Sequence, residues 1–140
     1  MVVTQSFAEN PKIYRRFGMS GHNGVDFRTK FNDTPKGRRE IYAVLDGEVA
    51  EAGPNYKDLS RGYGIYIRLI HKGGAQTVYG HLNSVRVVKG DKVKAGQVMA
   101  ISDNTGFSTG AHLHFGYRPV GFDWNNGYKG YVDPAKYFLV

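Results

Sequence analysis

The sequence predicts an all-β protein, and three observations support this. Nineteen glycines punctuate a chain of 140 residues. The segments between them are short, and several alternate apolar and polar residues with period two, the pattern of half-buried strands. No long stretch repeats apolar residues with the helical period of 3.6. A chain of this length suffices for one core, so residues 1–140 are expected to form a single domain.

The first strand signals lie in residues 41–51 and 64–71. Residues 41–51 carry Asp46-Gly47 between two apolar runs, which predicts a hairpin or a sharply bent strand. In residues 64–71, alternation places Ile65, Ile67 and Leu69 on one face. The sequence Lys72-Gly73-Gly74 predicts a turn, and the remaining strands are expected over 75–79, 85–88, 97–102 and 112–118.

Helix signals are confined to two short stretches. Residues 56–60 are expected to form one turn, and Asp133-Pro134 has the form of an N-cap followed by proline at the first helical position. The expected fold is an antiparallel sheet forming a groove, with at most a short C-terminal helix.

Residues 43–49 and 88–98 resemble the two halves of biotinyl- and lipoyl-carrier domains. A carrier needs a lysine at a hairpin tip, but Asp46-Gly47 occupies the nearest equivalent turn. We therefore exclude carrier activity and keep the expectation of a sandwiched-barrel core.

The formal net charge of +7 indicates an anionic partner, either nucleic acid or a bacterial wall rich in carboxylates and phosphodiesters. A solvated basic surface explains the charge equally well. The basic residues are scattered apart from two loop clusters, Lys36 with Arg38 and Arg39, and Lys89 with Lys92 and Lys94. No basic stripe interleaves with base-stacking aromatics, so nucleic acid is not expected.

The chain contains no cysteine, which excludes thiol catalysis, disulfides and Cys-ligated zinc. Its first ten residues lack the basic and apolar regions of a signal peptide, and no stretch is apolar for long enough to span a membrane.

His112 and His114 are the first candidates for a metal site. In a strand, residues two apart point to the same face, with Cα atoms roughly 6.5–7 Å apart. This spacing favours one metal ligand and one free imidazole, and it leaves open which histidine takes which role.

His22 and Asp26 supply further candidates. Asn23-Gly24 between them favours a loop entering a strand, with Gly24 permitting an unusual backbone. With one histidine of the later pair they make three N/O ligands, which leaves a coordination position open, as in catalytic zinc sites.

His81 and His71 complete the histidines. His81 is expected at a strand end, where its imidazole could reach the same groove and stabilise an oxyanion or protonate a leaving amine. His71, beside Lys72-Gly73, is interpreted as structural.

Four motifs together resemble the lysostaphin/LytM-type zinc endopeptidases of peptidoglycan, which have a duplicated-hybrid-motif fold. The resemblance runs from about Gln5 to Pro134. The motifs are His22-Asn23-Gly24-Val25-Asp26, Tyr79-Gly80-His81-Leu82, residues 88–97, and residues 109–115 with His112-Leu113-His114.

The resemblance implies that His22, Asp26 and His114 hold one Zn²⁺ per chain and that His112 and His81 are catalytic. The implied reaction is hydrolysis of a peptide bond in the stem or cross-bridge of peptidoglycan, with His112 accepting the proton of the attacking water. We expect a monomer that acts on the cell wall, periplasmic or extracellular. Its compactness and the lack of an export signal indicate a phage-delivered endolysin, a protein released by lysis or an excised enzyme domain. No membrane insertion is expected.

Residues 28–40 and 56–61 are longer than the usual connections of this family, and both loops are expected to frame the groove. Members often carry a tyrosine just before the first metal histidine. Here Phe17 is close and Tyr14 more distant.

Two other classes of protein compete with this interpretation. An Fe(II) oxygenase also uses two histidines and a carboxylate, but usually as His-x-Asp and with a downstream arginine, for which Arg118 is the available residue. A non-catalytic member of the same fold would bind wall or regulate another hydrolase. Such domains typically lose metal ligands, which this chain retains.

Overall fold

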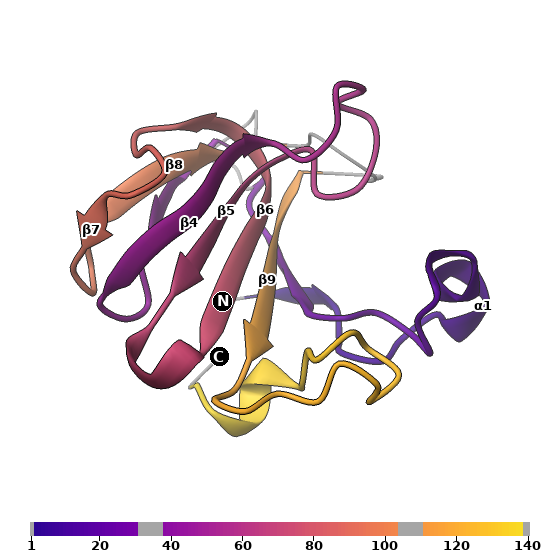
Figure 1. Ribbon diagram of the computed structural model, residues 1–140. Coiled ribbons are helices and arrows are strands. Elements are labelled where there is room, and N and C mark those ends of the chain that lie inside the picture. The colour runs from indigo at the N-terminus through magenta and orange to yellow at the C-terminus, as the bar shows by residue number, and fades with distance from the viewer. Residues whose placement is uncertain (1, 31–37, 104–110, 139–140) are drawn as a thin grey trace.

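The computed structural model describes residues 2–30, 38–103 and 111–138, which form a mostly antiparallel, open β-sheet (Figure 1). The strand order is β1-β2-β9-β6-β5-β4-β7, and β8 pairs with both β6 and β3. This confirms the all-β prediction. The strands are β1 (Val3–Gln5), β2 (Val25–Arg28), β3 (Glu40–Tyr42), β4 (Gly47–Pro54), β5 (Ile65–Ile70), β6 (Gln76–Val85), β7 (Lys92–Val93), β8 (Val98–Ser102) and β9 (His112–Arg118).

Within the described residues, four short helical segments accompany the sheet: α1 (Pro11–Tyr14) and the 3₁₀ turns η1 (Arg15–Phe17), η2 (Lys72–Gly74) and η3 (Pro134–Lys136). The expected C-terminal helix is present as η3, where the Asp133 side chain accepts a hydrogen bond from the Ala135 amide at 3.0 Å. The expectation of no other helix was wrong, because α1 forms near the N-terminus. Its Asn10-Pro11 start resembles Asp133-Pro134 in placing a short polar residue before proline, but the Asn10 side chain makes no cap hydrogen bond. The helical turn expected over 56–60 was also wrong, since that segment forms bends and a turn.

Two strand predictions need correction. Residues 41–51 do not form a hairpin, because β3 pairs with β8 while β4 pairs with β5 and β7. The strand expected over 85–88 does not form separately. Instead, the return strand β6 continues from Gln76 to Val85, well beyond the expected end at residue 79.

Strand β5 contributes to the apolar core on one face of the sheet. Ile67 and Leu69 are fully buried in the main apolar cluster, and Ile65 packs against it, as the alternation predicted. Tyr66 points to the opposite face, where it packs with Val78 and Tyr131 in a second cluster. Both faces of the sheet are therefore covered, and the face with the second cluster is the one that carries the histidines described below.

A bulge interrupts β6 at His81. Up to Gly80, β6 pairs with β9, and from Leu82 it pairs with β8. At this change of partner His81 has φ of 62°, and its amide donates to the carbonyl of Tyr63 at 2.7 Å. Bulges redirect side chains, so His81 points out of the regular alternation. The expectation that His81 ends its strand was wrong.

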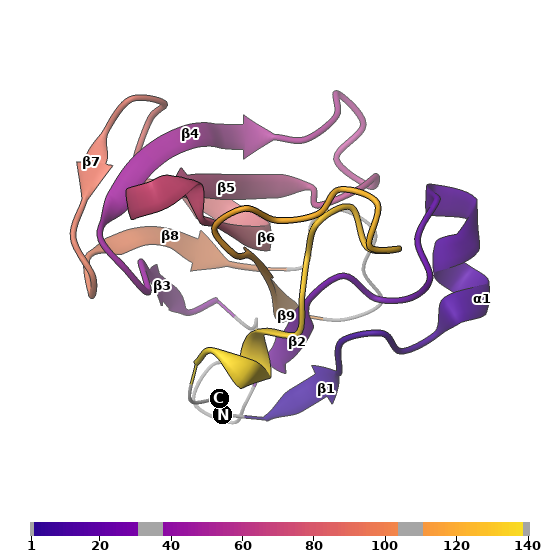
Figure 2. The same cartoon turned by 60° about the horizontal axis from the view of Figure 1, so that its bottom comes forward.

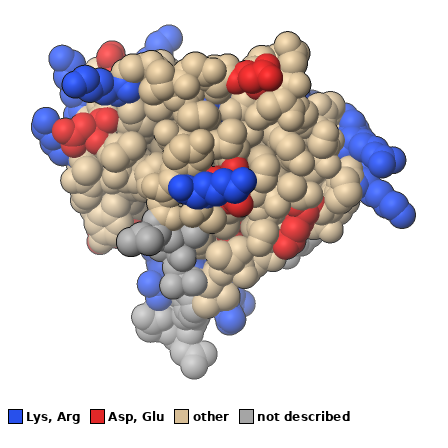
Figure 3. Space-filling model, turned by 90° about the horizontal axis from the view of Figure 1, so that it is seen from below, with Lys and Arg blue, Asp and Glu red and all other residues tan. Residues whose placement is uncertain are grey.

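Three segments lie on the same side of the view in Figure 2: α1, the connection between β4 and β5, and the segment between β9 and η3; residues of all three line one pocket. None of the helices in the described ranges is long and apolar enough to cross a membrane. On the face shown in Figure 3, basic side chains lie mainly near the outline and form no continuous stripe.

Candidate metal centre

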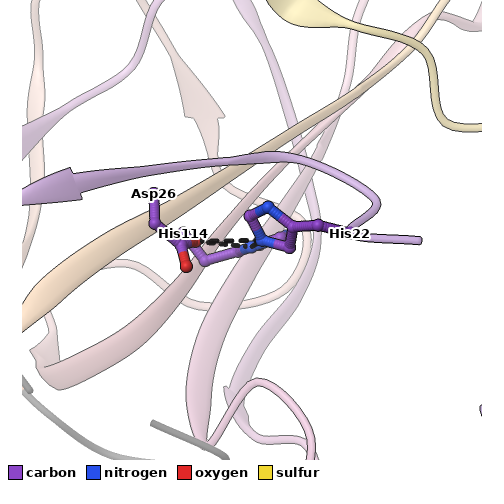
Figure 4. A group of neighbouring side chains, drawn as sticks. All are labelled: His22, Asp26 and His114. Carbon is purple, nitrogen blue, oxygen red and sulfur yellow. Dashed lines mark hydrogen bonds and ion pairs between the residues drawn. The ribbon is translucent and has the colours of Figure 1, made fainter. Parts of the chain in front are cut away.

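His22, Asp26 and His114 meet at the junction of β2 and β9 (Figure 4). Asp26 lies in β2 directly opposite His114 in β9, so the register of this strand pair sets two of the three side chains face to face. His22 reaches them from the loop that enters β2. All three residues are buried.

The three ligand atoms are almost equidistant. Asp26 Oδ1 lies 3.0 Å from His114 Nδ1 and 3.2 Å from His22 Nε2, and the two nitrogens are 3.1 Å apart. Four ligands at zinc-to-ligand distances of 2.0–2.1 Å in a tetrahedron are separated by about 3.3 Å. The N₂O donor set therefore fits a small ion with tetrahedral preference.

The orientation of His22 is fixed by a hydrogen bond outside the cluster. Its Nδ1 lies 3.0 Å from the carbonyl oxygen of Ser6, which can only accept, so Nδ1 carries the proton. Nε2 then presents a lone pair to the cluster, the tautomer that a metal ligand requires.

The electrostatics of the cluster favour the ligand forms of both partners. Burial alone would raise the pKa of Asp26, but the adjacent imidazoles of His114 and His22 hold that pKa well below its usual range. Burial lowers the pKa of His114, against the opposing effect of Asp26. At neutral pH this gives a carboxylate beside a neutral imidazole, which are the forms that bind metal.

His112 and His81 lie beside the cluster and outside it. His112 Nε2 is 3.3 Å from Asp26 Oδ2, whereas His22 and His114 contact the other carboxylate oxygen, Oδ1. The His81 and His112 rings are 4.7 Å apart. The structure thus brings His112 and His81 next to the cluster. It is His114, rather than His112, that contributes one of the three converging ligand atoms.

Tyr14 is a site residue that sequence reasoning left undecided. Its ring packs on His22 with centroids 5.4 Å apart, and burial, with a further contribution from Asp26, raises the pKa of Tyr14 to about 12. The phenol therefore keeps its proton and can donate a hydrogen bond. The Asn10-Pro11 start of α1 is the sequence signal that could have indicated this approach.

Two adjoining pockets of about 280 and 250 Å³ form a groove over the cluster, and they share Tyr14, His81 and His114. The larger pocket is walled in part by Tyr56, so the prediction that the 56–61 loop frames the groove is confirmed for Tyr56. The 28–40 loop is different: residues 31–37 lie outside the described residues, and Arg28 and Arg39 line a separate pocket. Thr109 and Gly110 also lie outside the described residues.

An open antiparallel sheet with a buried His-Asp-His cluster beneath a groove is the arrangement of a candidate metal-binding protein. The family model of Peptidase family M23 matches residues 20–134, and the chain belongs to that family.

Comparisons with individual proteins agree. The glycyl-glycine endopeptidase ALE-1 of Staphylococcus capitis is 41% identical over 102 residues, covering 70% of this chain and 25% of that protein. The peptidoglycan DD-endopeptidase ShyB of Vibrio cholerae is 36% identical over 117 residues, covering 81% and 24%. This chain thus spans about a quarter of the length of these relatives.

The catalytic domain of lysostaphin from Staphylococcus simulans superposes with a TM-score of 0.68 at 33% identity, covering 84% of this chain and 79% of that domain. The predicted family resemblance and fold are confirmed.

Proposed function

We propose that this chain is a zinc-dependent endopeptidase that hydrolyses peptide bonds in the stem or cross-bridge of bacterial peptidoglycan. The observation that carries the proposal is the convergence of His22, Asp26 and His114, whose ligand atoms all lie within 4.8 Å of one another. The family membership and the similarity to peptidoglycan and glycyl-glycine endopeptidases supply the substrate class.

In this proposal His22 Nε2, Asp26 Oδ1 and His114 Nδ1 hold the zinc. Zinc with three such ligands lowers the pKa of a bound water and polarises a carbonyl. Ser6 keeps His22 in the required tautomer through its carbonyl. The burial of all three ligands excludes bulk water from their lone pairs.

His112 and His81 supply the proton chemistry. Asp26 Oδ2 orients His112 from 3.3 Å, which suits a general base that removes a proton from the attacking water. In this proposal His81, which lines the groove at the bulge in β6, stabilises the negative charge that develops on the carbonyl oxygen. The protonated Tyr14 phenol, which donates to Gln5 Oε1 at 3.5 Å and lines the same pocket as His81, is a second donor in the groove.

Mass spectrometry of fragments released from purified peptidoglycan tests the proposal. New free amines at one peptide linkage, lost with a zinc chelator and restored by zinc, are the expected result. Absence of release from walls of several chemotypes, despite bound zinc, would instead support a non-catalytic wall-binding or regulatory member. Bound iron with dependence on a keto-acid would support an oxygenase.

Two histidine variants separate binding from catalysis. We expect His114→Ala to lose zinc and activity together, because it removes a converging ligand atom. His112→Ala should retain zinc at one per chain while turnover falls about 10²–10⁴-fold, the usual contribution of a general base. Metal analysis and peptide hydrolysis measure the two properties.

His71→Gln is the matched control, since His71 is a buried histidine outside the site that contacts the Asp46 carbonyl and Thr77 Oγ1. It should keep both zinc and turnover. Retained activity in either the His114 or the His112 variant would contradict the assignment.

A further inference from the structure

Strand β9 continues the metal-centre face toward a buried arginine. His112, His114, Gly116 and Arg118 alternate along this strand and therefore share one face of the sheet. Arg118 lies four residues beyond His114, about 13 Å along an extended strand. Both residues line the larger pocket of the groove, so this pocket runs from the histidines to Arg118.

Arg68 of β5 meets Arg118 at this end of the pocket. The Nη1 atoms of both residues donate to Oε1 of Gln76, each at 3.1 Å. One amide oxygen thus holds two guanidinium groups side by side. Arg68 also donates to the Tyr131 hydroxyl at 2.8 Å and to Glu51 Oε1 at 3.1 Å.

Arg118 is only 8% exposed, and its other contacts are neutral. Nε donates to the Lys129 carbonyl at 2.9 Å, and the guanidinium packs against the rings of Phe122, Trp124 and Tyr131. Within residues 2–30, 38–103 and 111–138, no carboxylate forms an ion pair with Arg118. Burial lowers the pKa of Arg118, and Arg68 lowers it further, against raising effects of Tyr131, Tyr63 and Glu51; the guanidinium stays charged at neutral pH.

The arginine pair, Arg68 and Arg118, therefore brings two positive charges together against one contacting carboxylate. That carboxylate belongs to Glu51, whose side chain is 50% exposed and contacts Arg68. A buried cation without a counter-ion is costly, and an anion from outside the chain would relieve that cost. Guanidinium groups recognise carboxylates through paired, charge-assisted hydrogen bonds.

We propose that the arginine pair binds a carboxylate of the substrate peptide, a few residues from the bond that is cleaved. The enzyme would then prefer peptides that carry such a carboxylate, as a side chain or a free C-terminus, over a neutral oligoglycine chain. This inference rests on the proposed peptidase function and narrows its substrate class.

The test compares peptides that differ only in this charge. One pair ends in a carboxylate or a carboxamide, and a second, amidated pair carries Glu or Gln at the same distance from the scissile bond. For the wild-type protein loaded with zinc, we expect kcat/KM to be about 10–100-fold higher for the preferred carboxylate form, mainly through KM, the range of charge-assisted hydrogen bonds. The peptide pair whose two members differ in kcat/KM shows whether the ligand of the arginine pair is a terminal or a side-chain carboxylate.

Arg118→Gln should abolish this discrimination, so that kcat/KM becomes equal for the carboxylate and neutral forms of each peptide. Arg118→Lys, which keeps the charge but loses the planar fork, should discriminate weakly and serves if the first variant does not fold. Arg86→Gln is the matched control, because Arg86 is an exposed residue outside the groove lining. It removes the same net charge and should leave the discrimination unchanged.

Equal kcat/KM for charged and neutral peptides would overturn the inference and leave the proposed function standing. The arginine pair would then only hold the segment between β9 and η3 against the sheet. If no peptide is cleaved, the proposed function fails by itself. Calorimetric binding of the same peptides to the zinc-loaded protein then decides the inference: tighter binding of the carboxylate form supports it, and equal binding overturns it.

Discussion

At the scale of single residues, the metal centre depends on the missing side chain of Gly24. A Cβ atom there would lie 2.5 Å from the carbonyl oxygen of Phe115 and 2.6 Å from His114 Cε1. Gly24 has no positive φ, so the expectation of an unusual backbone was wrong, and close approach is the reason for glycine. Among the described residues, nothing hydrogen-bonds His114 Nε2, so packing against Gly24 replaces the usual support of a ligand histidine.

Gly24→Ala should therefore displace His114. We expect zinc affinity to fall about 10–100-fold, as when the support of a ligand is lost, and stability to fall by about 1–3 kcal/mol through overpacking. Competition with a chromophoric chelator and denaturant unfolding measure the two effects. Gly53→Ala is the control: that position has open space but a φ of 131°, so it should lose stability and keep zinc affinity. Unchanged zinc affinity in Gly24→Ala would show that His114 is positioned by other contacts.

At the scale of elements, the bulge in β6 costs backbone energy at His81, whose φ of 62° is unfavourable for a residue with a Cβ. His81→Gly and His81→Ala both remove the imidazole, so their difference isolates the backbone. We expect the glycine variant to be more stable by about 1 kcal/mol, because glycine adopts positive φ without that penalty. Both variants should lose turnover. Equal stability in chemical denaturation would mean that the bulge relaxes when the imidazole is removed.

Local patterns predicted what depends on neighbours in the sequence. The alternation in β5 identified its buried face, and the two-residue spacing placed His112 and His114 on one wall of the groove. The separate partners of β3 and β4, and the bulge at His81, depend on strand register that long-range contacts fix. Sequence patterns did not indicate the arginine pair for the same reason, since Arg68 and Arg118 are fifty residues apart and meet at Gln76 of a third strand. The roles assigned to the five site residues stay predictions.

At the scale of the whole molecule, the candidate ligands join distant parts of the chain. Asp26 and His114 are separated by 88 positions and meet only across the β2–β9 pair. The groove above them is walled by α1, by the β4–β5 connection and by the segment after β9, which are joined to one another through the sheet. An ion bound by His22, Asp26 and His114 would therefore tie the N-terminal part of the chain to β9 and, through it, to the centre of the sheet.

Because the unfolded chain cannot hold these three atoms together, zinc should bind the folded state selectively and stabilise it. At a free zinc concentration one hundred times the dissociation constant, this linkage contributes about 2.7 kcal/mol. For a chain of this size we expect Tm to rise by about 5–10 °C in calorimetry of the metal-free protein titrated with zinc. His114→Ala should show no such rise, whereas His112→Ala should show most of it, because His112 contacts Asp26 without joining the three converging atoms. An equal shift in the His114 variant would place the ion elsewhere in the molecule and remove the structural basis for the proposed chemistry.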